Sequence, residues 1–291
     1  MGFDTFIEVE LPRKNASLFS EIAHLVRRYD SLWNRFSSES LVTRINSSQS
    51  WVTLDDETFH LLKEASVLSE RTYGMFCPLI GGLMDLWGFS TNPRVPSPQD
   101  LERELQIIRE STIMFNEEEK AVARIGEAKL DLGGVAKGYF VDLLVRFLKE
   151  KKVGYFLINA GGTVFGAGKT WDVGILHPRE GRLLGSIRIR NLCVSTSADY
   201  FRFFEEGGRR YHHVLNPQNG YPGETFISVT VVAPCGTIAD VLSTAIMAGD
   251  EAFLRRVLSE FPGVSVLAVK KDGSTIISPG MQELLNSEYK G

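Results

Sequence analysis

Asp240 and Thr244 are four residues apart in a segment whose apolar pattern predicts a helix from about residue 238 to residue 248. In a helix this spacing puts both side chains on one face, one turn apart. A carboxylate and a hydroxyl can bind a hard cation such as Mg²⁺ when phosphate oxygens, a backbone carbonyl and water complete the coordination shell. The alternative is a capping box between Thr237 and Asp240, with Thr244 bonded back to a carbonyl. The spacing alone favours this alternative.

Two glycine-rich turns could bring the backbone close to an anion. A predicted strand runs through Gly133 and Gly134 into a helix, and at such a junction amide groups can face a phosphate. Lys137 lies one turn into this helix, where its ammonium could reach the same phosphate. A tight turn with a solvated lysine is the stronger explanation of these residues alone, since they match no known phosphate-loop pattern. Gly161 and Gly162 follow another predicted strand. A glycine pair there lets the backbone approach a ligand or forms a hairpin or bulge.

His213 is the candidate general base. It lies in a turn segment, residues 211–222, that contains Asn-Pro and Asn-Gly pairs. A histidine at the mouth of a structured loop can take a proton from an attacking hydroxyl near neutral pH. The alternative, favoured in the absence of other context, is a histidine that satisfies buried carbonyls beside the turn. His212 is the weaker candidate, because it points the other way if a strand ends here.

The elements that must position these residues indicate an α+β fold with antiparallel pairing in the second half, and no linker divides residues 1–291 into separate domains. Ser97 is a plausible cap for a helix that begins at Pro98. A polar stretch covers residues 37–50. The predicted helices otherwise cover residues 16–33, 56–72, 134–151, 238–248 and 251–260. The predicted strands cover residues 3–11, 112–116, 121–125, 128–132, 155–159, 171–176, 184–190, 192–195, 226–233, 264–270 and 274–277.

The composition of the 291 residues is that of an ordinary globular protein, with 43% hydrophobic and 23% charged residues. The net charge of −4 gives no electrostatic reason to bind nucleic acid or an anionic membrane. Cys77, Cys193 and Cys235 form no CxxC pair, so free thiols are expected. No signal peptide or membrane span is visible. The sequence as written indicates a cytoplasmic protein, or a periplasmic or membrane-associated one if a leader was removed.

Taken together, these segments resemble the FAD:protein FMN transferases of the ApbE family. The resemblance runs along nearly the whole chain, and no single motif decides it. Three positions depart from the family pattern, namely Leu41, Ala198 and Asn216, and they affect local loop geometry more than the chemistry. Eight segments carry the resemblance in the family's order, at residues 1–2, 40–46, 86–89, 131–139, 159–162, 195–200, 213–217 and 239–245.

The resemblance implies a fold of mixed sheets with flanking helices, with a nucleotide site in a cleft between two intimately packed lobes. It implies Mg²⁺ bound by the Gly134 carbonyl, Asp240 and Thr244, and it makes His213 the base. FAD is the implied substrate, and the implied partner is an acceptor protein with a threonine or serine flavinylation motif, on a redox or membrane subunit. The implied FAD site consists of Met1, Phe36, Trp87, Gly88, Phe89, Asp131, Lys137, Val214 and Ser243.

Three other functions remain open at this point. A hydrolase of the same fold could let water attack FAD and release FMN and AMP. A binding protein could hold FAD without chemistry. An oxidoreductase could use FAD as a redox cofactor, although residues directed at the diphosphate argue against it.

Overall fold

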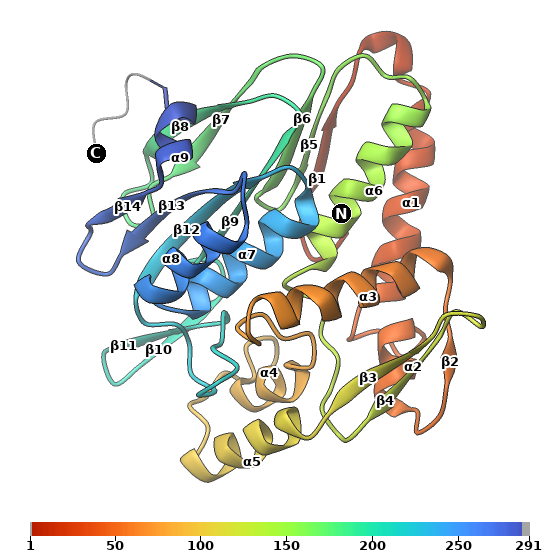
Figure 1. Ribbon diagram of the computed structural model, residues 1–291, viewed down its shortest axis with the longest axis vertical. Coiled ribbons are helices and arrows are strands. Elements are labelled where there is room, and N and C mark those ends of the chain that lie inside the picture. Colours follow the sequence, from red (N-terminus) through yellow and green to blue (C-terminus); the bar gives the residue numbers. More distant parts are fainter. Residues whose placement is uncertain (1, 287–291) are drawn as a thin grey trace.

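The computed structural model describes residues 2–286, which form the α+β fold that the sequence predicts. Figure 1 shows α6 and α7 lying against a large sheet, with α2 to α5 and a smaller sheet beside them. The helices are η1 (Arg13–Asn15, a 3-10 turn), α1 (Leu18–Trp33), α2 (Leu41–Ser47), α3 (Asp56–Arg71), α4 (Gly81–Trp87), α5 (Pro98–Arg109), α6 (Ala136–Glu150), α7 (Gly236–Ala248), α8 (Glu251–Glu260) and α9 (Pro279–Leu284). The strands are β1 (Ile7–Glu10), β2 (Val52–Thr53), β3 (Thr112–Asn116), β4 (Ala121–Ile125), β5 (Phe156–Ala160), β6 (Thr163–Ala167), β7 (Trp171–Leu176), β8 (Leu183–Ile189), β9 (Leu192–Ala198), β10 (Phe203–Glu206), β11 (Arg209–His212), β12 (Phe226–Ala233), β13 (Ser265–Lys270) and β14 (Thr275–Ile277).

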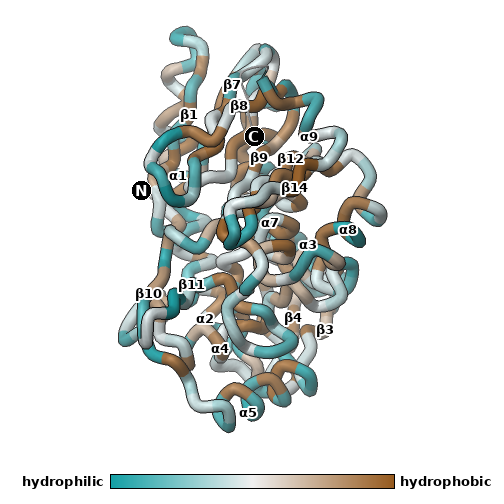
Figure 2. The backbone as a smooth tube through the Cα atoms, turned by 90° about the vertical axis from the view of Figure 1, so that its left-hand side faces the viewer, coloured by the Kyte–Doolittle hydropathy of each residue, from teal (hydrophilic) through white to brown (hydrophobic). Residues whose placement is uncertain are grey.

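The large sheet has the strand order β1-β5-β6-β9-β12-β13-β14, and every neighbouring pair is antiparallel. Helices α6 and α7 pack on one face, and the β7–β8 hairpin and α9 cover part of the other. All eight residues of β12 are buried, because this strand is covered on both faces. Figure 2 shows the hydrophobic stretches of β12 and α7 in the interior of the molecule. The sheet and α7 therefore form a rigid base for any side chain that they carry.

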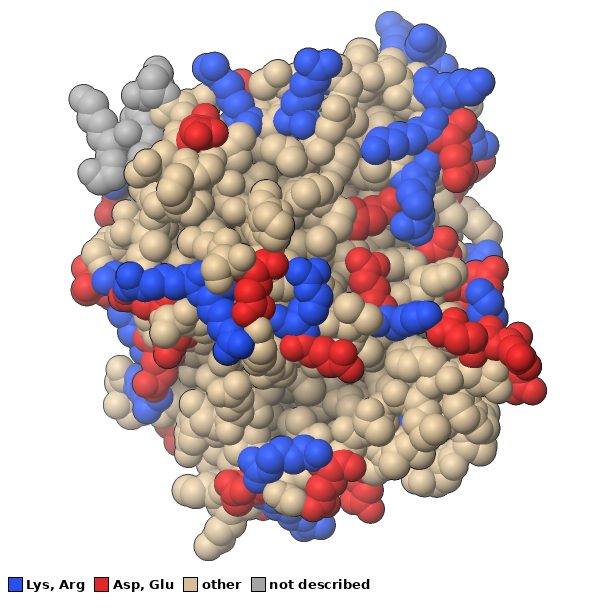
Figure 3. All heavy atoms as spheres, viewed as in Figure 1, with Lys and Arg blue, Asp and Glu red and all other residues tan. Residues whose placement is uncertain are grey.

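A smaller sheet, β2-β4-β3, packs with the N-terminal helices, and the β10–β11 hairpin lies beside α4 and α5. On the face seen in Figure 3, lysine and arginine side chains are interspersed with aspartate and glutamate side chains. Of the helices within residues 2–286, none is both long and apolar enough to cross a membrane.

Most of the long predicted helices are confirmed to within two or three residues, and Ser97 caps α5 by accepting a hydrogen bond from the Asp100 amide. The predicted strand at residues 128–132 is wrong. The Leu130 amide there donates to the Asn46 side chain, and the Asp131 amide donates to the Pro78 carbonyl, so the segment pairs with loops instead of a strand. The sequence does not predict the strands β2, β6, β10 and β11, or the helices η1, α2, α4 and α9.

Helix α2 lies inside the polar stretch that the sequence analysis left without structure. Ser40 caps this helix, because its hydroxyl accepts from the Thr43 amide at 3.0 Å. Leu41, Val42 and Ile45 are buried on its inner face. A seven-residue helix shows too few turns for its period to stand out among serines, so only packing reveals it.

Candidate functional site

Asp240 lies on α7 with its carboxylate almost wholly buried, at 3% exposure. Its Oδ2 accepts a hydrogen bond from the Gly138 amide at 2.9 Å, and its Oδ1 accepts from the Ser195 hydroxyl at 3.4 Å. The capping-box alternative for this residue is wrong, because Cys235 is the N-cap of α7 and makes no side-chain cap. The Thr237 hydroxyl donates to Asp142 instead. A charge buried in this way needs a compensating partner, which makes Asp240 the centre of the candidate site.

Hydroxyl groups surround Asp240 and Thr244. Ser197 lies 3.4 Å from the Thr244 hydroxyl and 2.9 Å from the Ser243 hydroxyl, and the buried Ser243 hydroxyl donates to the Asp240 carbonyl at 3.0 Å. Sequence analysis selected Ser243 but missed Ser195 and Ser197. The alternating serines of β9 were the available signal, since residues i and i+2 of a strand share a face. The cluster is therefore rich in oxygen donors.

The start of α6 brings Gly134 and Lys137 to the same place. A Cβ built on Gly134 would lie 3.2 Å from Thr244 Cγ2 and 3.3 Å from the Phe76 ring, so the backbone of Gly134 packs directly against Thr244. The Lys137 ammonium donates to the Gly133 carbonyl at 3.0 Å and lies 3.8 Å from Asp240 Oδ2. The structure thus unites the predicted residues Gly134, Lys137, Asp240 and Thr244, which lie about a hundred positions apart in the chain.

Asp131 and Phe36 are joined through Arg35, a residue that sequence analysis missed. Asp131 Oδ1 accepts from the Gly133 amide at 2.7 Å, and its Oδ2 lies 3.3 Å from an Arg35 guanidinium nitrogen. The same guanidinium lies over the Phe36 ring at 5.1 Å. Phe36 is 63% exposed, which leaves most of its ring free. Arg35 had no motif to mark it, since its ionic partner Asp131 lies almost a hundred residues further along the chain.

Trp87, Gly88 and Phe89 belong to a separate aromatic cluster. The Trp87 side chain is fully buried, and its indole N–H donates to the Gly220 carbonyl at 2.8 Å. The Phe89 ring stacks on it with centroids 5.9 Å apart. Gly88 ends α4 with a φ of +64°, and a Cβ there would lie 2.3 Å from the Asn92 carbonyl oxygen. The cluster therefore fixes the loop that carries Gly88 and Phe89.

This aromatic cluster also touches the histidine segment. The Tyr211 ring lies 5.4 Å from the Trp87 ring, and Tyr211 precedes His213 by two residues. Val214, the next residue, is buried and donates its amide to His212. Met1 lies outside the described residues.

The two histidines differ in what their rings do. His212 is buried; its Nε2–H donates to the Gly223 carbonyl at 2.8 Å, and its Nδ1 accepts from the Val214 amide at 3.3 Å. The bonding of buried backbone groups, which was the alternative considered for His213, is the role of His212, although the His213 ring also bonds one carbonyl, that of Arg202. His213 is partly exposed and places Nδ1 3.2 Å from the Arg202 carbonyl. Since a carbonyl can only accept, the proton is on Nδ1, and Nε2 keeps a lone pair for use as a base.

Although part of the His213 side chain reaches the surface, desolvation by the surrounding protein and the neighbouring His212 lower its pKa to about 3. The hydrogen bond to the Arg202 carbonyl opposes this shift, and the charges of Arg202 and Lys137 add to it. Burial also lowers the pKa of His212. Both rings are therefore neutral near pH 7, the state in which Nε2 of His213 can accept a proton.

These low pKa values predict how stability depends on pH. The unfolded chain binds protons at both histidines below a pH of about 6.5, whereas in the folded protein the pKa of His213 is about 3 and that of His212 is also lowered. Stability is therefore complete above that value and is lost as the pH falls toward about 3. Urea midpoints at about pH 7.5 and about pH 5 should show this loss, and it should shrink in His213→Gln. An equal loss in this variant would mean that His213 does not contribute, and that His212 and the carboxylates set the dependence.

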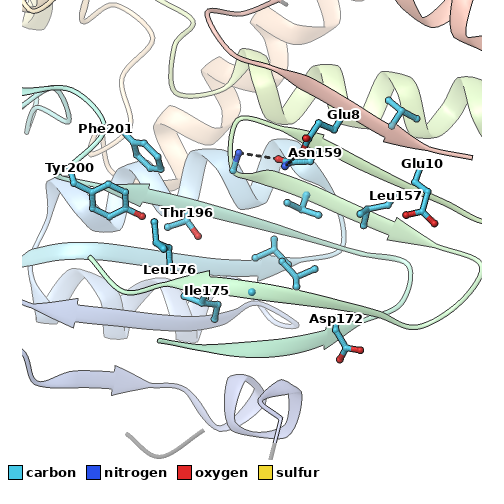
Figure 4. Close-up of a pocket in the computed structure, with 16 residues that line it drawn as sticks. Glu8, Glu10, Leu157, Asn159, Asp172, Ile175, Leu176, Thr196, Tyr200 and Phe201 are labelled. Carbon is cyan, nitrogen blue, oxygen red and sulfur yellow. Dashed lines mark hydrogen bonds between the residues drawn. The ribbon is translucent and has the colours of Figure 1, made fainter. Parts of the chain in front are cut away.

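A cavity of about 610 Å³ lies on the opposite face of the large sheet (Figure 4). Thr196 lines it, whereas Ser195 and Ser197 face α7, because successive side chains of β9 point to opposite faces. Gly162 also lines this cavity, so the second glycine turn belongs to a hairpin, β5–β6, away from Asp240. The cavity and the cluster around Asp240 are thus separate places.

This chain is similar to known proteins along most of its length. A model of the ApbE family matches residues 1–268. An FAD:protein FMN transferase of Klebsiella pneumoniae (strain 342) is 33% identical over 246 residues, which is 82% of this chain and 77% of that protein. The ApbE protein of Thermotoga maritima has a TM-score of 0.90 and 32% identity, with 99% of this chain and 98% of that chain covered. The flavin transferase ApbE from Vibrio cholerae gives a TM-score of 0.84 at 25% identity, with 98% and 97% covered. The fold predicted from the resemblance is confirmed, and the chain belongs to the ApbE family and is an enzyme of the flavin-transferase kind.

Proposed function

We propose that this enzyme is a Mg²⁺-dependent FAD:protein FMN transferase, which attaches FMN through a phosphoester to a threonine or serine hydroxyl of an acceptor protein and releases AMP. One observation carries the proposal. A buried carboxylate, a hydroxyl and an ammonium converge where a glycine-rich turn opens α6, with Lys137 3.8 Å from Asp240. Such a place suits a bound diphosphate, because it combines an oxygen-rich cation site with fixed positive charge.

The donor atoms near Asp240 fit Mg²⁺. They are a carboxylate, the Thr244 hydroxyl and, on the proposal, the carbonyl of Gly134, whose backbone packs against Thr244. All are hard oxygen donors, and a set this small leaves coordination positions for water and phosphate oxygens. Within residues 2–286, no group of three or more histidine, cysteine, aspartate or glutamate side chains is placed to hold a metal. A site completed by substrate oxygens does not require such a group.

In the proposed displacement at phosphorus, different residues of the enzyme have different roles. The acceptor hydroxyl attacks the FMN-side phosphorus, the bond to the AMP oxygen breaks, and His213 Nε2 takes the hydroxyl proton. Lys137 and the N-terminal end of α6 hold the anionic diphosphate. Bound Mg²⁺ supplies charge neutralisation at the diphosphate. Phe36 and the loop at Gly88 and Phe89 provide the remaining surface for FAD, while the buried Trp87 supports that loop.

The acceptor is proposed to carry a short Asp/Ser-Gly-Ala-Thr/Ser segment, on a redox or membrane subunit. The test is incubation of the enzyme with FAD, MgCl₂ and a purified protein that contains a Ser-Gly-Ala-Thr segment. We expect in-gel flavin fluorescence on that protein, loss of the signal with EDTA, and one AMP released for each FMN attached.

Two other outcomes would overturn the proposal. Release of AMP and free FMN without labelling of the protein would identify a hydrolase, in which water takes the place of the hydroxyl. FAD binding without AMP release, at any magnesium concentration, would identify a binding protein. Replacement of the acceptor's threonine by valine is the matched control, since it removes the attacking hydroxyl and changes little else.

A further inference from the structure

Helices α6 and α7 hold each other through a reciprocal set of hydrogen bonds. In one direction, the Gly138 amide of α6 donates to Asp240 Oδ2 of α7 at 2.9 Å. In the other direction, Asp142 of α6 accepts from the first turn of α7. Its Oδ1 accepts from the Gly236 amide at 2.6 Å, and its Oδ2 accepts from the Thr237 amide at 2.8 Å and the Thr237 hydroxyl at 2.6 Å. Each helix thus supplies one carboxylate to backbone amides of the other.

The backbones of the two helices touch at the same point. A Cβ built on Gly138 would lie 2.3 Å from the Gly236 carbonyl oxygen, and one built on Gly236 would lie 2.4 Å from the Gly138 carbonyl oxygen. No side chain fits between the helices there. A small rotation of α7 would therefore bring backbone against backbone, because no side chain at the contact can move aside. Asp142 lies one turn beyond Gly138 on α6, and Asp240 lies one turn beyond Gly236 on α7. The hydrogen bonds therefore fix the angle at which α7 presents Asp240.

Asp142 also caps the N-terminus of α7, which has no capping side chain of its own. The N-cap residue of α7, Cys235, makes no side-chain hydrogen bond to the helix. The free amides at that end are satisfied instead by a carboxylate from another helix, whose negative charge suits the positive end of the helix dipole. Asp142 itself is partly buried, and both of its carboxylate oxygens bond to the first turn of α7.

We infer that Asp142 is a positioning residue for the proposed metal site, which acts by capping α7 from outside and so fixing Asp240 and Thr244. This inference rests on the proposed function. Groups that orient metal ligands from the second layer change metal affinity by about 10–100-fold when they are replaced. The expected effect of Asp142 is thus on Mg²⁺ affinity, beyond any effect on stability.

The test compares Asp142→Asn with Asp55→Asn. Asp55 caps α3 with the same pattern, since it accepts from the Thr58 amide at 3.2 Å and from the Thr58 hydroxyl at 2.5 Å, but α3 carries none of the metal-site residues. Mg²⁺ is titrated into each FAD-bound protein, and binding is followed by calorimetry and by the shift in melting temperature. Urea unfolding of the same proteins gives their stabilities.

We expect Asp142→Asn to weaken Mg²⁺ binding by about 10-fold or more, and Asp55→Asn to leave it unchanged, whatever stability each variant loses. Thr237→Val removes only the hydroxyl bond and should weaken binding less, which provides a folded variant if Asp142→Asn does not fold. The inference would be overturned if Thr237→Val and Asp142→Asn both bound Mg²⁺ as tightly as the unaltered enzyme does. If the unaltered enzyme itself does not bind Mg²⁺, the proposed function fails instead.

Discussion

Replacement of Asp240 by asparagine should lower the rate of FMN transfer by at least about 100-fold, since loss of a direct metal ligand should cost no less than loss of a group that orients one. The substitution keeps the shape of the side chain, and its amide oxygen can still accept from the Gly138 amide. It removes the negative charge that faces Lys137 at 3.8 Å and that Mg²⁺ requires. Initial rates of AMP release, measured over a range of MgCl₂ concentrations, give the effect.

Asp250→Asn is the control for this prediction. Asp250 caps α8, the helix that follows α7, and asparagine is itself a good cap, so transfer should be unaffected. If Asp240→Asn kept the full rate at low magnesium, Asp240 would not be a metal ligand. In that case its buried charge would serve only to join α6 to α7.

Replacement of His213 by alanine should lower kcat by about 10²–10⁴-fold and leave FAD binding intact. The tautomer set by the Arg202 carbonyl leaves Nε2 free to accept a proton, and the ring is partly exposed. Because the pKa of His213 lies at about 3, its ring is neutral across the ordinary assay range. The loss should therefore be similar at about pH 6 and about pH 8. Single-turnover labelling of the acceptor measures kcat separately from binding.

His60→Ala, on the exposed surface of α3, is the control and should behave like the unaltered enzyme. His212→Asn offers a contrast, because His212 satisfies backbone groups at Gly223 and Val214. That change should lower stability and reduce transfer only as far as folding is impaired. Full transfer by His213→Ala would remove this residue from the mechanism and leave the acceptor hydroxyl to lose its proton to water or phosphate.

The pair Asp240 and Thr244 could be selected because helix periodicity fixes which side chains share a face. Local sequence could not show whether Asp240 caps its own helix or faces a bound cation. The first turn of α7 is capped by Asp142, which lies on another helix. Two residues that the resemblance implies for the FAD site also differ in their surroundings. Trp87 is buried as a support, whereas Phe36 keeps most of its ring exposed.

The sequence by itself determined the fold class, the long helices, the family resemblance and the residue types at the site, because these depend on local periodicity and on the order of motifs along the chain. Tertiary structure alone decided that Ser195 and Ser197 join the cluster, that Arg35 links Asp131 to Phe36, and that His212 takes the structural role. The contacts of Ser195 and Ser197 with α7 and of Arg35 with Asp131 join segments distant in sequence, and the role of His212 depends on how its loop folds. Such contacts depend on how two surfaces pack, and no local pattern records that packing.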